Sequence, residues 1–317
     1  MTIHLPSPET GARDQAPDQA PARTRAPRRG GRGGAGPWLV VPAVLLLGVF
    51  VVRPLLRTAE LSLYASDIIG NPTRFVGLTN YGELLTDPGF VRVTLTTILI
   101  ALLGTALAVT AALGAALLLR RRLPGGPAFS IVFSLPFAYS AASASAVFAG
   151  LYAPSVGILN VVLAGVGVEG PAWLSDPVAA IGAISIATGW YEFGFAFLVL
   201  TAAVRAVPPE VVEAAQLDGA GGWRLASRIL VPIMRPSLLF LAVTGTISGL
   251  QTFAQIQVLT RGGPGGATTT VVFQLFQLAF GNGTPDFGRA SVVAVVLVVL
   301  VTAVTVVQFR LLGGRES

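Results

Sequence analysis

The feature that most constrains this chain is a series of six long apolar runs. Four carry no charged residue, one contains a single acid, and the first is free of charge up to Val52. A helix needs about 20 apolar residues to cross the ~30 Å hydrocarbon core of a bilayer, and each run can supply them. Only 11% of the residues are charged, against about 25% in soluble domains. The runs are Trp38–Val52 extended through Pro54 towards Leu63, Val93–Leu119, one within Ala128–Tyr152, one within Val178–Val204, Ser237–Thr260 and Ala290–Phe309. We therefore expect an all-α, polytopic membrane protein with six transmembrane helices.

The residue inventory argues against several kinds of chemistry. The chain has no Cys, and its 21 cationic side chains are all Arg. A thiolate site, a phosphate-binding loop with its Lys and a Schiff base are therefore excluded. The single His is His4, in the polar N-terminal tail. We expect no catalytic residue, no metal site and no cofactor bound by this chain, so any ATP hydrolysis would take place on another subunit.

The placement of Arg predicts the orientation of the chain. Residues 1–37 are rich in Pro, Gly, Ala and Arg, which predicts a disordered, basic cytoplasmic tail and not a nucleic-acid site. Most of the Arg residues fall on the side of this tail, so both termini, including a short segment 313–317, are expected in the cytoplasm. Val156–Val168 is too short to span and is expected to be a surface helix on the extracytoplasmic side.

One cytoplasmic segment, residues 205–236, has the pattern of a helix, a break and a second helix. Pro209 suits a first helical turn, Glu210 and Glu213 lie at its positive end, and Gly219 suits a left-handed stop. A second helix is predicted near Trp223, with the return into the membrane at Pro232. Such a short, amphipathic segment suits docking into a groove on a cytosolic partner.

The same segment carries a specific spacing. Glu213-Ala214-Ala215 is followed by Gly219, then by Ile229, and one residue later by Val231-Pro232. With Val in place of Leu before the Pro, this resembles the signature of the permease subunits of binding-protein-dependent ABC importers. The resemblance extends over residues 38–312 and implies the six-span fold of type I ABC importer permeases. It implies that the ATPase-coupling residues are Glu213, Ala214, Ala215, Asp218, Gly219, Ile229 and Pro232.

The resemblance also implies partners. These are a second, homologous permease subunit, two ATPase subunits that bind ATP and Mg²⁺, an extracytoplasmic substrate-binding protein and the surrounding membrane lipid. The loop 75–90 and a surface helix at Thr269–Phe280, after the glycine-rich turn Gly262–Gly266, are expected to meet the binding protein.

Shorter stretches suggest the branch of the family. They are Phe75–Tyr81, Gly157–Asn160, Leu259–Pro264 and Thr305–Arg310, and they resemble the carbohydrate and glycerol-phosphate branch, most of all the first permease of the Ugp-type sn-glycerol-3-phosphate importer. The expected cargo is glycerol-3-phosphate or a glycerophosphodiester, with a sugar such as trehalose or maltose as the alternative. Arg53-Pro54 and Tyr191–Phe193 depart from the usual pattern and leave the cargo open.

The residues of the substrate path are predicted from polar side chains within the spans. Thr244, Ser248, Gln251 and Gln255 would share one helical face, and polar stripes in membrane helices avoid lipid. Tyr139 and Ser143 are candidates in the third run, and Trp190 and Glu192 in the fourth. Arg53 and Arg57 could contact an anionic ligand.

Each of these assignments has an alternative. The polar face could serve only hydrogen bonds between helices, Glu192 could pair with the partner subunit, and the two Arg could extend to the lipid interface. Two other functions also stay open: an intramembrane enzyme that uses Glu192 or Asp176 as a base, and a secondary transporter.

Overall fold

A computed structural model describes residues 36–120, 124–281 and 283–312. The predictions of a disordered tail, apart from its last two residues, and of a short C-terminal segment at 313–317 therefore lie outside the described residues. The chain divides into two units, Met1–Val52 and Arg53–Ser317.

The described part of the first unit is helical and apolar. Helix α1, Gly36–Leu47, begins two residues before the predicted run and continues as a π-helical turn, Gly48–Val52. Val44, Leu45 and Phe50 are all more than half exposed, as expected for side chains that face lipid rather than water.

The second unit opens outside the apolar runs with a small hairpin that the all-α prediction did not include. Helix α2, Arg53–Leu61, leads into β1, Tyr64–Ser66, which pairs antiparallel with β2, Pro72–Phe75. The turn forms because the carboxylate of Asp67 accepts hydrogen bonds from the backbone N–H groups of Ile69 and Asn71. Helix α3, Thr79–Thr86, follows.

Three uninterrupted spans lie in this unit: α4 (Pro88–Leu119), α8 (Pro177–Arg205) and α15 (Phe287–Leu312). Helices α4 and α8 begin where an Asp side chain accepts backbone N–H groups just before a Pro, which is a strong helix start. With the apolar helix Val40–Leu61, four helices among the described residues are long enough to span, and two bent pairs raise the number to six. The six-span fold is confirmed in this form.

The third run is bent rather than straight. Helices α5, Gly126–Ala138, and α6, Ala141–Leu151, meet at 106°. Pro136 lies in the last turn of α5, and Ser140 caps α6 by accepting the N–H of Ser143.

The fifth run is also interrupted, and the prediction of one helix over Ser237–Thr260 is wrong. Helix α12 spans Arg235–Leu250, and α13 begins only at Ala254 and ends at Leu259. Gly249 weakens the last turn, and Thr252 uses its carbonyl to accept the hydroxyl of Thr270, so the backbone there is satisfied without a helix.

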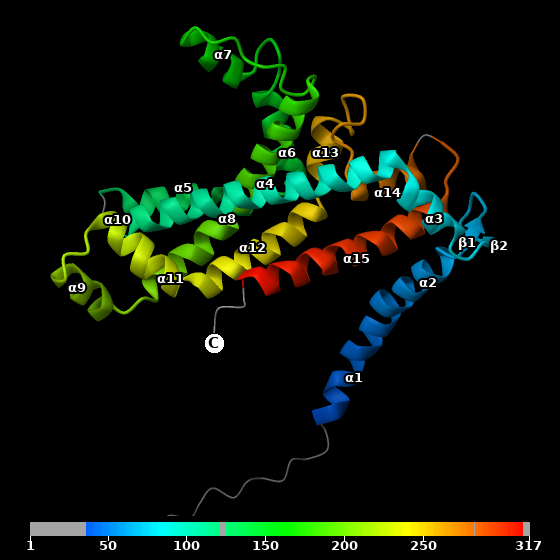
Figure 1. The fold of residues 1–317 in the computed structure, drawn as a ribbon, viewed down its shortest axis with the longest axis horizontal. Coiled ribbons are helices and arrows are strands. Elements are labelled where there is room, and N and C mark those ends of the chain that lie inside the picture. The colour runs from blue at the N-terminus through cyan, green and yellow to red at the C-terminus, as the bar shows by residue number, and fades with distance from the viewer. Residues whose placement is uncertain (1–35, 121–123, 282, 313–317) are drawn as a thin grey trace, which may run out of the picture. The chain divides into compact units, whose positions relative to one another are not determined.

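Small residues position the spans. One face of α4 is buried and carries Ala101, Gly104, Ala108, Ala112 and Ala116, whereas its Leu residues are mostly exposed. This face packs on α8 and α12 (Figure 1). A Cβ at Gly249 would lie 2.7 Å from the Cα of Ala101, so the helices approach each other as small-residue interfaces in membranes do.

Two further helices lie outside the spans. Helix α7, Ile158–Gly165, forms within the predicted surface segment, and α14, Val271–Phe280, begins at Thr270, whose hydroxyl accepts the N–H of Phe273. Figure 1 shows α3, β1 and β2 at one end of the helices of the second unit and α9 and α10 at the other.

Candidate coupling segment and membrane cavity

The segment 205–236 forms the predicted helix, break and helix. Helix α9 spans Pro209–Leu217, Asp218 follows it, and Gly219 has φ of +77°. The N–H of Ala220 donates to the carbonyl of Ala215, which closes the helix as glycine-ended helices commonly close. The second helix consists of α10 (Gly222–Leu225), a π-helical turn (Ala226–Leu230) and α11 (Val231–Ile233).

The return into the membrane differs slightly from the prediction. Pro232 does not end the second helix, which continues to Ile233. The 71° bend comes immediately afterwards, before Arg235 begins α12. A Pro near the start of α11 leaves the helix intact because its missing N–H and its ring obstruct only the preceding turn, which is π-helical here.

The motif residues divide between an inner and an outer side. Ala215 is buried and packs with Leu225 and Leu230 in a hydrophobic cluster that includes the C-terminal ends of α4 and α8. Glu213 and Ala214 are exposed, as are Asp218 and Gly219, whereas Ile229 and Pro232 are half-buried. The second Ala thus anchors α9, and the acidic and turn residues are left accessible.

The exposed side also carries large apolar groups. Leu217 is 89% exposed and Trp223 is 82% exposed. Two such groups on either side of a rigid turn suit burial against a partner.

Within the membrane, Glu192 borders a cavity of about 270 Å³ between α4, α8 and α12. The hydroxyl of Thr105 on α4 donates to Oε2 of Glu192 at 3.4 Å. The other oxygen, Oε1, is buried and has no hydrogen-bond partner in the described part of the chain. Thr244 and Ser248 line the same cavity. A buried carboxylate oxygen without a hydrogen bond destabilises the folded state. A hydrogen-bond donor that reached Glu192 would remove this cost.

A second, mostly apolar groove of about 640 Å³ is lined by residues of α4, α5, α6 and α8, near the bend between α5 and α6. Tyr139 and Trp190 both line it, with their rings 6.2 Å apart. Trp190 also meets Phe148 edge-on at 5.5 Å. Two of the predicted path residues thus meet in this groove, and three meet in the cavity of Glu192.

The remaining path residues are not brought together. Because α12 ends at Leu250, the single helical face predicted for Thr244, Ser248, Gln251 and Gln255 does not exist beyond Ser248. Gln251 is exposed at the end of α12 and Gln255 is buried in α13. Ser143 lines neither cavity; its backbone and hydroxyl bond to Ser140.

The two candidate anion contacts are both exposed. Arg57 forms an ion pair with Glu60 at 2.8 Å, so its charge is already balanced on its own helix. Arg53 begins α2, one residue before Pro54. The anion-binding role remains a prediction.

Sequence reasoning missed Thr105, which faces Glu192 from another helix. Thr105 is one of several Thr residues in the second run, among them Thr96, Thr97 and Thr110, and no spacing along α4 distinguishes it. Gly245, whose added Cβ would lie 3.3 Å from Glu192 Oε2, was missed for the same reason.

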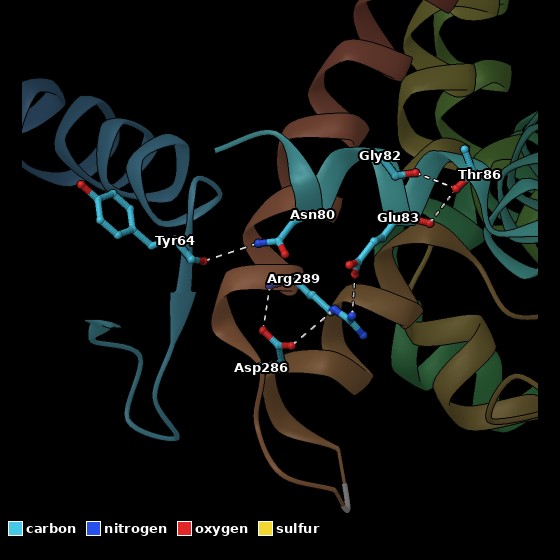
Figure 2. Close-up of polar contacts among 7 residues, drawn as sticks. All are labelled: Tyr64, Asn80, Gly82, Glu83, Thr86, Asp286 and Arg289. Carbon is cyan, nitrogen blue, oxygen red and sulfur yellow. Dashed lines mark hydrogen bonds and ion pairs between the residues drawn. The ribbon is translucent and has the colours of Figure 1, made fainter. Parts of the chain in front are cut away.

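A polar cluster joins α3 and α15 (Figure 2), at the end of the unit opposite α9 (Figure 1). Arg289, at the start of α15, lies 2.8 Å from Glu83 on α3 and 3.7 Å from Asp286. The amide of Asn80 donates weakly to the carbonyl of Tyr64. These residues hold the 75–90 segment, which is predicted to meet a binding protein, against the first turn of α15.

Comparisons with known proteins agree with this arrangement. Residues 125–315 match the family model described as binding-protein-dependent transport system inner membrane component. The chain is 34% identical to the sulfoquinovosyl glycerol transport system permease of Agrobacterium fabrum, over 86% of this chain and 89% of that protein.

Two other relatives are similar over comparable lengths. The trehalose/maltose transport system permease of Thermococcus litoralis is 32% identical, over 86% of this chain and 92% of that protein. The sn-glycerol-3-phosphate transport system permease of Brucella abortus is 30% identical, over 88% and 94%.

The fold is shared with a chain of a bacterial alginate ABC transporter crystallised with an alginate pentasaccharide-bound periplasmic protein, with a TM-score of 0.74 at 19% identity over 86% of this chain and 92% of that chain. The fold is therefore that of the type I importer permeases, and its spans make this a multi-pass inner-membrane protein. Together, the matched model and the three relatives show that the chain belongs to the family of binding-protein-dependent transport system inner membrane components.

Proposed function

We propose that this chain is a permease subunit through which a hydroxyl-rich, carbohydrate-type solute crosses the membrane into the cell by alternating access. The chain is not itself an enzyme; ATP and Mg²⁺ bind to a separate ATPase subunit. The single observation that carries the proposal is the rigid turn at Gly219, which exposes Glu213 and Asp218 beside a buried anchor at Ala215. Such a turn can pass a rigid-body movement of an ATPase to the spans packed on it.

The assembly follows from the family. A second, homologous permease completes the membrane path. One ATPase subunit docks on α9 and its turn and the other docks on the second permease, and an extracytoplasmic binding protein delivers the solute at the end that carries α3 and the hairpin. Both termini lie in the cytoplasm in this arrangement, which agrees with the excess of Arg on that side.

The lining of the cavity supports the class of solute. Glu192 offers an unpaired acceptor, Thr244 and Ser248 offer hydroxyls, and no Arg lines the cavity among the described residues. Sugar hydroxyls donate hydrogen bonds to such acceptors. The aromatic ring of Trp190, which lines the separate apolar groove, suits the apolar face of a sugar ring. A phosphate would find no cationic partner among the residues that line this cavity.

Glycerol-3-phosphate or a glycerophosphodiester stays the second candidate, because a relative 30% identical is named for sn-glycerol-3-phosphate transport. The relatives named for a sulfoquinovosyl glycerol and for trehalose and maltose are slightly more similar, and they favour a glycoside.

The test is ATP hydrolysis by the complete complex in lipid nanodiscs, with its binding protein and a panel of candidate solutes. Stimulation by a glycoside or disaccharide supports the proposal. Stimulation only by glycerol phosphates would instead identify the second candidate as the solute. If no ATPase co-purifies with the chain, or if transport continues without ATP, the proposal fails.

A further inference from the structure

A third cavity, of about 450 Å³, lies between the last turns of α4 and the coupling segment. Its walls are mainly apolar and come from both elements. Helix α4 and its C-cap contribute Gly114, Leu118 and Arg120, and the coupling segment contributes Gln216, Trp223 and Leu230. None of the predicted coupling residues from Glu213 to Pro232 lines it, and it shares no lining residue with the two membrane cavities.

The charge in this cavity is unbalanced. Arg120 is the one charged residue among those that line it, and the residue is half-buried. Within residues 36–120, 124–281 and 283–312, no carboxylate forms an ion pair with it. The C-terminal end of α4 compensates a part of this charge. A partly desolvated cation still attracts an anion more strongly than a solvated one does.

The depth of the cavity indicates what kind of anion it would take. Helix α4 has 32 residues and is about 48 Å long, so it exceeds the ~30 Å hydrocarbon core. Its last turn therefore reaches the headgroup level. Leu118 is 64% exposed and Trp223 is 82% exposed at the rim of the cavity, as expected of side chains at the boundary between acyl chains and headgroups.

We propose that this cavity binds an anionic phospholipid, with the lipid phosphate at Arg120 and the first carbons of an acyl chain along Leu118 and Trp223. A free phosphate would contact Arg120 and leave the apolar Leu walls uncovered. A phospholipid would contact both the Arg and the apolar walls. The bound lipid bridges α4 and the second helix of the coupling segment. The site needs only that α4 spans the membrane, so its failure would leave the proposed transport function standing.

The experiment measures lipid retention by the complete transporter. The complex is purified, stripped of lipid with detergent, and exposed to nanodiscs of phosphatidylcholine with or without phosphatidylglycerol, and retained lipid is counted by native mass spectrometry. Arg120→Gln should lower phosphatidylglycerol retention at least fivefold and leave phosphatidylcholine unchanged. Arg310→Gln, an exposed Arg at the end of α15, is the matched control and should retain lipid like the wild type.

A second pair of variants tests the same lipid site if Arg120→Gln does not assemble. A Cβ at Gly114 meets nothing within 4 Å, so Gly114→Leu should fold while filling the cavity and reducing retention to a similar extent. Arg120→Lys should keep most of the lipid. Equal retention by the wild type, Arg120→Gln and Gly114→Leu overturns the proposal. Displacement of the lipid by millimolar inorganic phosphate shows a free-anion site instead, and lipid retention only after removal of the ATPase shows that the ATPase covers the cavity.

Discussion

The guanidinium of Arg289 lies 2.8 Å from the carboxylate of Glu83 and so joins α15 to α3 (Figure 2). Both side chains are 55% exposed, so water and salt screen the pair, and exposed ion pairs contribute about 0.2–1 kcal/mol. We predict that a double-mutant cycle of Arg289→Gln and Glu83→Gln gives a coupling free energy of unfolding in that range, and that 1 M NaCl removes it. A salt-independent coupling above about 2 kcal/mol would contradict an exposed pair.

Glu213 is exposed on α9 next to the buried anchor Ala215, and we expect it to pair with a basic group of the ATPase. Glu213→Arg should leave the thermal stability of the chain unchanged but lower solute-stimulated ATP hydrolysis roughly tenfold or more, because like charges across an interface cost several kcal/mol. The control is Glu210→Arg, an exposed acid one turn earlier. Equal loss in both variants would indicate a general effect of charge, and wild-type coupling in Glu213→Arg would rule out the contact.

Gly219 has φ of +77°, whereas Gly221 has φ of −86° and open space around its Cα. Gly219→Ala should cost about 1 kcal/mol or more because a Cβ disfavours left-handed backbone. Gly221→Ala, the matched control, should change stability little. Thermal unfolding of the two variants in the same detergent compares them, and an equal melting temperature would mean that the turn is not under this constraint.

Glu192 borders the cavity, accepts a hydrogen bond from the hydroxyl of Thr105, and has a second, buried oxygen without a partner among the described residues. Glu192→Gln preserves the shape but replaces one acceptor oxygen of the carboxyl group by an amide that only donates, so we predict a roughly tenfold higher solute concentration for half-maximal stimulation of ATP hydrolysis. The maximal rate should change much less. Glu169→Gln, an exposed acid between α7 and α8, serves as the control.

Two other results of the Glu192→Gln experiment would change the assignment. If the complex with the second permease dissociates, Glu192 serves that interface rather than the solute. If neither assembly nor the response to solute changes, the carboxylate has no part in transport.

Much of this fold could be predicted from local properties of the sequence. The apolar runs require spans because lipid offers no partner for backbone polar groups, and the span starts at Pro88 and Pro177 fall only one to five residues before the predicted runs. The stop at Gly219 was predictable because left-handed backbone favours glycine wherever it occurs.

Other features required interactions between distant residues. The bend at Tyr139 and the end of α12 at Leu250 divide runs that carry no charged residue, so the absence of charge could not locate them. The hairpin Tyr64–Phe75 depends on Asp67 closing its turn and on the contact between Ser66 and the N–H of Gly288, 222 residues away in the chain.

The features of the candidate site also fall into those that the sequence predicts and those that tertiary packing sets. The sequence alone determined that Glu192 lies within a span and that Glu213, Ala215 and Gly219 share one rigid turn, because these are properties of a single helix or turn. Only the tertiary structure decided that Thr105 faces Glu192, that Ser248 shares their cavity, and that Gln251 and Gln255 do not. The register between α4, α8 and α12 is set by how closely Ala101, Gly104 and Gly249 let the helices approach, and that packing is not encoded in the spacing along any one helix.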